Sequence, residues 1–182
     1  MKRPLLPLAA LVLGLLYLCF FSYLASSNSH LPQRVATHFD GSGHPNGWMS
    51  RTAHLRFMIV FGLVFPLLAP GIVYVSRFLP DWFYNLPHRD YWLAPARREA
   101  TMAYLFRQSL WVASLALCFV IGINYSLIQA NSLARAHLST LLVVLLNGCV
   151  LAGVAIWAVS LFRHFNRTPR EQRGSAPDMA DL

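Results

Sequence analysis

Four long apolar runs separated by polar segments dominate the chain. Each run contains no Asp, Glu, Lys or Arg. They cover roughly residues 5–25, 57–76, 108–128 and 138–162. A transmembrane helix needs about 20 mostly apolar residues. The runs are apolar all round, which is typical of helices surrounded by lipid and not of amphipathic helices in a small soluble domain. The pattern predicts an all-α integral membrane protein with four transmembrane helices.

Composition supports a membrane protein and excludes other classes. Of the 182 residues, 56% are hydrophobic and only 12% are charged, which argues against both a soluble domain and a disordered chain. The formal net charge is +8, but the basic residues lie between the apolar runs. This distribution indicates the lipid bilayer as the first partner and no nucleic acid. The three cysteines fall inside the runs, so a cysteine-rich zinc site is not expected.

The basic residues predict an orientation. Eleven of the fifteen Lys and Arg lie before the first run, between runs two and three, or after run four. The positive-inside rule therefore predicts a cell (plasma or inner) membrane protein with both termini in the cytoplasm and residues 25–56 and 129–137 outside. The first run is longer than the apolar part of a signal peptide, so we expect a retained anchor.

These spans divide the chain into four predicted parts. The first contains the first helix and its outer loop, and the second contains the next helix and an interfacial segment. The third holds helices three and four, and the last is a mobile cytoplasmic tail. The parts are residues 1–56, 57–107, 108–163 and 164–182.

The segment after the first run has the residues of a compact, turn-rich loop. Gly41 and Gly43 allow positive φ, and Pro45-Asn46-Gly47 is a strong turn signal. Trp48 suits the membrane interface, where an indole buries its ring and keeps its N–H hydrated. We expect this loop to fold back over the ends of the helices.

His38 and Asp40 leave three interpretations of the loop open. The two side chains can organise the loop's own backbone, since Asp followed by Gly-Ser-Gly readily forms an Asx-turn. They can also recognise a ligand or peptide, or bind a metal, because imidazole and carboxylate are zinc ligands. Of these, backbone organisation is favoured. His30, His44 and His54 are expected on the same side and could sense pH.

The order of residues in the loop resembles a known family. Leu31-Pro32, Thr37-His38-Phe39-Asp40, Gly43 and Pro45-Asn46-Gly47-Trp48 are followed by the basic Arg51. This pattern resembles the membrane proteins with a domain of unknown function called DUF1648, over about residues 10–60. That family usually has Pro where this chain has Ala36, and Lys where it has Arg51.

The resemblance implies a role for the loop. Some relatives, the SdpI-like proteins, protect a bacterial cell against an exported peptide toxin and signal to a regulator; their C-terminal motif is not found here. By this analogy, the chain binds or senses an extracytoplasmic peptide or envelope ligand and has a cytoplasmic regulator as partner. The candidate ligand-binding or loop-organising residues are His38, Asp40, Gly43, Asn46, Trp48 and Arg51.

Polar and proline residues within the runs support helix packing or an alternative function. Pro66 and Pro70 interrupt helical hydrogen bonding, and Asn124 and Asn147 are expected to bond to neighbouring helices. The same four residues could line a small transporter or transporter subunit. No nucleophile–base pair or nucleotide motif is present, so neither an enzyme nor a cofactor is expected. The ligand and the oligomeric state are not determined by the sequence.

The segment between runs two and three mixes aromatic and basic residues. It is interpreted as an interfacial anchor whose arginines (Arg77, Arg89, Arg97 and Arg98) face anionic lipids, or as a docking surface for a cytoplasmic partner. Pro95 is expected to open a helix that continues into the third span.

Overall fold

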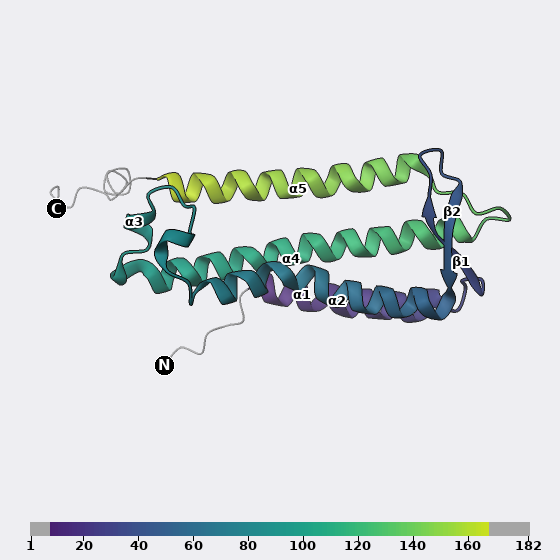
Figure 1. Ribbon diagram of the computed structural model, residues 1–182, viewed down its shortest axis with the longest axis horizontal. Helices are drawn as coiled ribbons and strands as arrows, with labels where there is room; N and C mark the ends of the chain where they lie inside the picture. Colours follow the sequence, from purple (N-terminus) through teal and green to yellow (C-terminus); the bar gives the residue numbers. More distant parts are fainter. Residues whose placement is uncertain (1–7, 168–182) are drawn as a thin grey trace, which may run out of the picture.

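The computed structural model describes residues 8–167, which form long helices and one β-hairpin (Figure 1). The hairpin lies at one end of the bundle, the hairpin end, and α3 lies at the other, the α3 end (Figure 1). The elements in chain order are α1 (Leu8–Asn28), β1 (Arg34–Phe39), β2 (Pro45–Ser50), α2 (Arg51–Ser76), the 3-10 helix η1 (Asp81–Phe83), α3 (Arg89–Trp92), α4 (Pro95–Asn131) and α5 (Thr140–Asn166).

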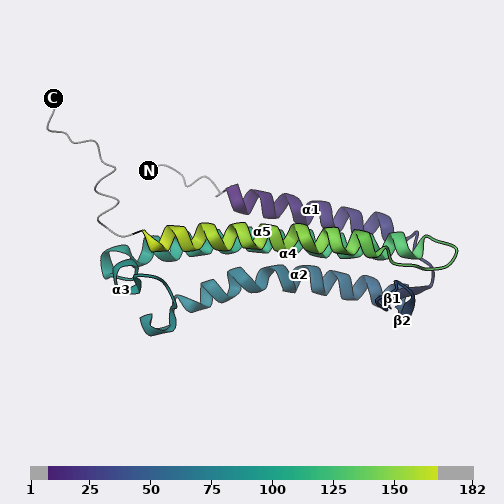
Figure 2. The same ribbon diagram turned by 90° about the horizontal axis from the view of Figure 1, so that it is seen from above.

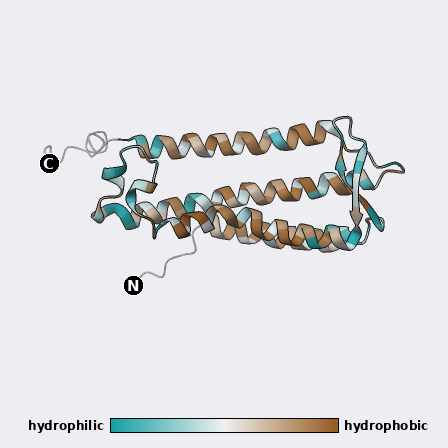
Figure 3. Ribbon diagram, viewed as in Figure 1, coloured by the Kyte–Doolittle hydropathy of each residue, from teal (hydrophilic) through white to brown (hydrophobic). Residues whose placement is uncertain are grey.

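Four of these helices are long and apolar enough to cross a membrane, as the sequence predicts. The shortest, α1, has 21 residues, which corresponds to about 30 Å of helix. Colouring by hydropathy shows apolar residues along the middle of the bundle and hydrophilic residues gathered at its two ends (Figure 3). The protein is therefore a multi-pass membrane protein.

The helices extend beyond the predicted apolar runs because hydropathy does not detect polar first turns. α2 begins at Arg51 after Ser50, whose Oγ accepts a hydrogen bond from the Ala53 N–H over 3.1 Å. α4 begins at Pro95 and continues into the third span, which confirms the expectation for this proline. α5 ends at Asn166, three residues beyond the predicted division at residue 163. The rest of the predicted tail, and the basic residues before position 8, lie outside the described residues.

α4 is the central helix, and α1, α2 and α5 all pack against it (Figure 2). Its buried stripe alternates steps of three and four residues: Leu110, Ala113, Leu117, Val120, Asn124 and Leu127. α2 presents a buried stripe at every fourth position: His54, Met58, Gly62, Pro66 and Pro70. Such seams bring helices together by close packing, since lipid removes most of the hydrophobic drive between helices.

Pro66 and Pro70 lie in this seam, and α2 stays continuous through both. A further close approach occurs at Gly62, where an added Cβ would overlap the ring of Phe20 from α1. The prolines therefore belong to the packed face of α2, as helix packing predicts.

α5 is held less extensively than the other helices. It packs on α4 through two notches, in which Leu146 lies over Gly122 and Leu115 lies over Gly153. Asn147 is exposed, and its Nδ2 donates to the Val143 carbonyl of the same helix over 2.8 Å. The prediction that Asn147 bonds to a neighbouring helix is wrong, because its amide nitrogen bonds within α5 although the residue lies beside α4.

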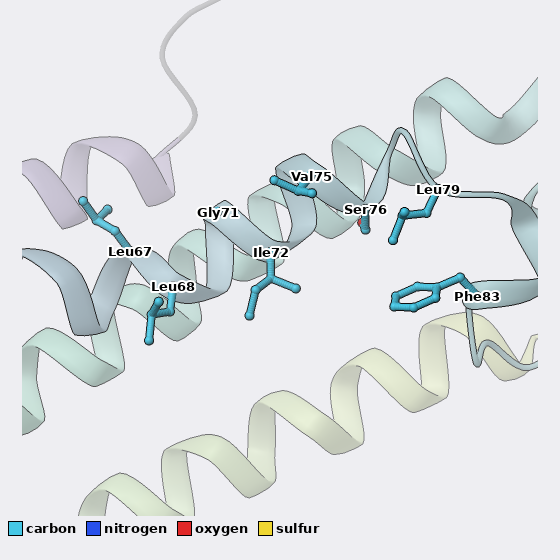
Figure 4. A pocket seen from close by; sticks show the side chains of 8 residues that line it. All are labelled: Leu67, Leu68, Gly71, Ile72, Val75, Ser76, Leu79 and Phe83. Carbon is cyan, nitrogen blue, oxygen red and sulfur yellow. The ribbon is translucent and has the colours of Figure 1, made fainter.

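An apolar groove of about 450 Å³ runs along the side of α2. Leu68, Ile72 and Phe83 point into the space between α2 and α5 (Figure 4). The groove follows from the arrangement of the bundle, since α2 and α5 each pack on α4 and not on one another.

Candidate functional site

The segment expected to be a turn-rich loop is an antiparallel β-hairpin. β1 and β2 pair Arg34 with Ser50 and Ala36 with Trp48, and the register shifts beside His38. Val35 and Ala36 are buried, and β1 contacts α2 and α4, so this part of the hairpin packs on the helix ends, as expected for a loop that folds back. The two strands themselves were not predicted. Each is short, and the turn residues around them mask the alternation of buried and exposed positions that is typical of a strand.

Asp40 organises the tip of the hairpin. Its Oδ1 accepts hydrogen bonds from the N–H groups of Ser42 and His44, each over 2.9 Å. The backbone N–H of Asp40 also donates to the His44 carbonyl. These hydrogen bonds, above all the one from the His44 N–H, hold the pKa of Asp40 below its usual value, because they stabilise the carboxylate.

Gly43 fits the tip against the connection between α4 and α5. Its φ of +81° is favoured only for glycine, and an added Cβ would overlap the carbonyl oxygen of Leu138. The Leu138 N–H donates to the Gly43 carbonyl over 2.9 Å. The rings of His44 and His137 meet edge to face, with centroids 5.5 Å apart. Gly43 is thus required both for the turn and for the contact.

Asn131, at the end of α4, clamps the middle of β1. Its Oδ1 accepts from the Ala36 N–H over 2.8 Å, and its Nδ2 donates to the Ala36 carbonyl over 2.9 Å. The amide therefore satisfies both backbone groups of a residue that is only 1% exposed. Sequence reasoning missed Asn131, which falls in the predicted outer segment 129–137 although α4 extends to it. The clamp uses an N–H that a proline at position 36 would lack.

His38 and Asn46 form a pair across the hairpin. The His38 Nδ1–H donates to Asn46 Oδ1 over 2.6 Å. Gly47 faces His38, and a Cβ at Gly47 would lie 2.8 Å from that of His38. Trp48 lies apart from this pair; the residue is 46% exposed, and the Arg34 guanidinium lies 4.9 Å from the ring centroid.

Arg51 joins the base of the hairpin to the end of α1. Its Nη1 donates to the carbonyl oxygen of Leu31 over 3.2 Å and to that of Ser29 over 3.4 Å. Its backbone N–H donates to the Gln33 carbonyl. The six predicted residues therefore do not form one cluster. They are spread over the tip, the cross-strand pair, one face and the base of the hairpin.

A groove of about 270 Å³ lies between the hairpin, α4 and α5. β1 contributes Thr37, His38 and Phe39. The helices contribute mainly apolar side chains, together with Ser126 and Asn147. The groove thus brings His38 and Asn147, which are far apart in the sequence, to one mixed apolar and polar surface.

Whether the hairpin could bind a metal ion depends on how its His and Asp side chains are placed. Within residues 8–167, no three His, Cys, Asp or Glu side chains lie close enough to hold one metal ion. His44 Nδ1 lies 3.8 Å from Asp40 Oδ1. Asp40 instead uses its Oδ1 for the backbone of the tip, as the loop-organising interpretation describes.

His54 lies in the first turn of α2 at the hairpin end, but it is buried inside the bundle and not exposed with the other histidines. The residue is 1% exposed, and its Nε2 lies 3.2 Å from Oδ1 of the fully buried Asn124. The expectation that Asn124 bonds to a neighbouring helix is confirmed. The burial of His54 could have been predicted from its spacing, because it lies four residues before Met58 on the same face of α2.

Comparison with known proteins identifies one region of the chain. Residues 10–63, which cover α1, the hairpin and the first half of α2, match the family model of a domain of unknown function (DUF1648). No curated protein and no solved structure matches the chain. The resemblance to DUF1648 is confirmed, and the further likeness to SdpI-like proteins stays a prediction.

Proposed function

We propose that the hairpin end binds a small extracytoplasmic peptide or envelope ligand and that the protein senses or sequesters it. The observation that carries this proposal is the groove of about 270 Å³ between β1, α4 and α5. Ligand sites are typically concave and mostly apolar, with a few polar groups that orient the ligand. Here His38, Ser126 and Asn147 are those polar groups.

The construction of the hairpin supports recognition of a ligand by a preformed surface. Asp40 shapes the tip, the Asn131 amide clamps β1, and Arg51 anchors the base. A surface held in this way needs little ordering when a ligand arrives, which reduces the entropic cost of binding. Immunity or signalling of the SdpI-like kind is proposed by analogy, and a cytoplasmic regulator is the partner that it implies.

The proposal places the hairpin outside the cell and both termini in the cytoplasm of the plasma membrane. The distribution of Lys and Arg supports this orientation. The start of α1 and the end of α5 also lie toward the α3 end, as four antiparallel spans require (Figure 1). Cysteine labelling tests it: with Cys19, Cys118 and Cys149 replaced, S42C should react with an impermeant maleimide in intact cells, whereas A96C should not. Labelling of A96C alone would overturn the orientation.

A growth assay tests ligand binding. Cells lacking the gene, complemented with wild type or variants, are exposed to a panel of exported apolar peptide toxins. We expect His38→Ala and the groove-filling Ser126→Phe to lose protection, while His30→Ala, an exposed histidine outside the groove, retains it. Equal sensitivity of deleted and complemented cells to every peptide would remove the immunity role.

A further inference from the structure

The α3 end contains a cluster of stacked rings between α4 and α5. The Tyr104 and His164 rings stack with centroids 3.9 Å apart and planes 15° apart. Trp92 of α3 lies against His164 and Phe165. Its Nε1–H donates to the Phe165 carbonyl over 2.9 Å, and its own carbonyl accepts from Thr101 Oγ1 over 2.8 Å. These contacts connect α3, α4 and α5 in one framework.

Two hollows open beside these rings, with volumes of about 300 and 330 Å³. Both are lined by Tyr104 and His164, so they adjoin one another. Four arginines complete their walls: Arg163 and Arg167 in one, Arg97 and Arg107 in the other. We call the two hollows together the arginine pocket.

The arginines of this pocket are not neutralised by carboxylates of residues 8–167. Elsewhere at the same end, Arg89 pairs with Asp90 and Arg98 with Asp81, each over 3.3 Å. This pairing differs from the expectation that Arg89 and Arg98 face lipid. Arg97 instead lies 4.0 Å from the centroid of the Tyr91 ring, which leaves its donors available. Positive charge is therefore concentrated where the pocket opens.

The pocket also lies at a defined depth. Arg107 directly precedes the apolar run of α4, and Arg163 directly follows that of α5. Both residues therefore mark the boundary between hydrocarbon and headgroups. Tyrosine and tryptophan rings favour this boundary as well. A ligand in the pocket would sit level with the lipid phosphates.

We propose that the arginine pocket binds the phosphate-bearing headgroup of an anionic phospholipid. Guanidinium groups form bidentate hydrogen bonds with phosphate, and basic pockets between transmembrane helices are suited to anionic headgroups. The depth of the pocket favours a membrane lipid over a soluble phosphate. This site is at the opposite end of the bundle from the proposed ligand groove and does not depend on it.

The test uses the full chain in nanodiscs that contain equal amounts of phosphatidylglycerol and phosphatidylcholine, followed by native mass spectrometry. We expect the wild type to retain phosphatidylglycerol preferentially. Each arginine near an anionic surface strengthens binding roughly fivefold, so the Arg107→Gln/Arg163→Gln variant should bind phosphatidylglycerol about 25-fold more weakly. The control is Arg34→Gln/Arg56→Gln at the hairpin end, which removes the same charge and should keep the preference.

Three results would overturn the proposal. The first is equal retention of both lipids by the wild type, a measurement that needs no variant to fold. The second is an equal loss of preference in the control variant, which would indicate net charge and no pocket. The third is displacement of phosphatidylglycerol by millimolar inorganic phosphate, which would indicate a site for a soluble anion.

Discussion

At the hairpin end, backbone groups are satisfied by the Asn131 amide, the Asp40 carboxylate and the Arg51 guanidinium, whereas at the α3 end arginines and aromatic rings surround open hollows. The Asn131 clamp and the Asp40 turn leave little freedom in the hairpin. The α3 end places Arg97, Arg107 and Arg163 around the Tyr104–His164 stack. The hairpin end therefore uses its polar side chains on its own backbone, whereas the α3 end leaves the arginines of its pocket without carboxylate partners among residues 8–167.

The largest expected effect comes from the tip of the hairpin. Gly43→Ala should destabilise the protein by about 3 kcal/mol, because it adds a Cβ at positive φ and against the Leu138 carbonyl. Thermal denaturation in detergent micelles measures it. The matched control is Gly41→Ala, whose Cβ would have no atom within 4 Å. Equal melting temperatures for the two variants would contradict the docking of the tip on the α4–α5 connection.

The clamp should have the next largest effect. Asn131→Ala leaves the N–H and C=O of the buried Ala36 without partners, which should cost about 2 kcal/mol. Asn147→Ala is the control, since this amide is exposed and bonds only to its own helix. Ala36→Pro removes one of the two bonds and should cost about half as much. The clamp would be unimportant if Asn131→Ala were no worse than Asn147→Ala.

A smaller effect is expected at the α3 end. Trp92→Phe keeps an aromatic ring but removes the hydrogen bond to the Phe165 carbonyl, at a cost of about 1 kcal/mol. Hydrogen exchange should show faster opening at the end of α5. Trp82→Phe provides the comparison, because Trp82 is 74% exposed. Protection of α5 that is unchanged in Trp92→Phe would show that α3 does not restrain this helix.

The smallest effect is the loss of stability at the hairpin tip when Asp40 is protonated at low pH. The pKa of Asp40 is lowered in the folded hairpin, so its contribution to stability is complete above the ordinary value of 3.8 and is lost as the pH falls through the lower folded pKa. The amide resonances of Ser42 and His44 should therefore shift with a midpoint below 3.8. In Asp40→Asn, which keeps an acceptor oxygen, this transition should disappear. A midpoint at or above 3.8 would contradict the hydrogen bonds to the carboxylate.

Several features were predictable because they depend on neighbouring residues. The spans were predicted from apolar runs that are long enough to cross a bilayer, and the start of α4 was predicted from Pro95. The DUF1648 resemblance also depends on a contiguous motif, from Leu31 to Arg51. The turn residues around Gly43 and Asn46 predicted a compact loop, but they did not predict the strands on either side.

Other features were not predictable because their partners are distant in the chain. Runs that are apolar all round do not show which face is buried, so the seam that holds His54 was missed and the hydrogen-bond partner of Asn147 was predicted wrongly. Asn131 was also missed, because it bonds to a residue 95 positions away.

By itself, the sequence determined that lipid surrounds this chain, how many times the chain can cross the bilayer and where its charges gather, since these depend on local hydrophobicity and composition. Only the tertiary structure decided that α4 is the centre, that the hairpin lies on the α4–α5 connection, and that Asn124 meets a histidine 70 residues away. The physical reason is that a hydrogen bond or a helix notch needs both partners within a few ångströms, and packing alone brings distant residues that close.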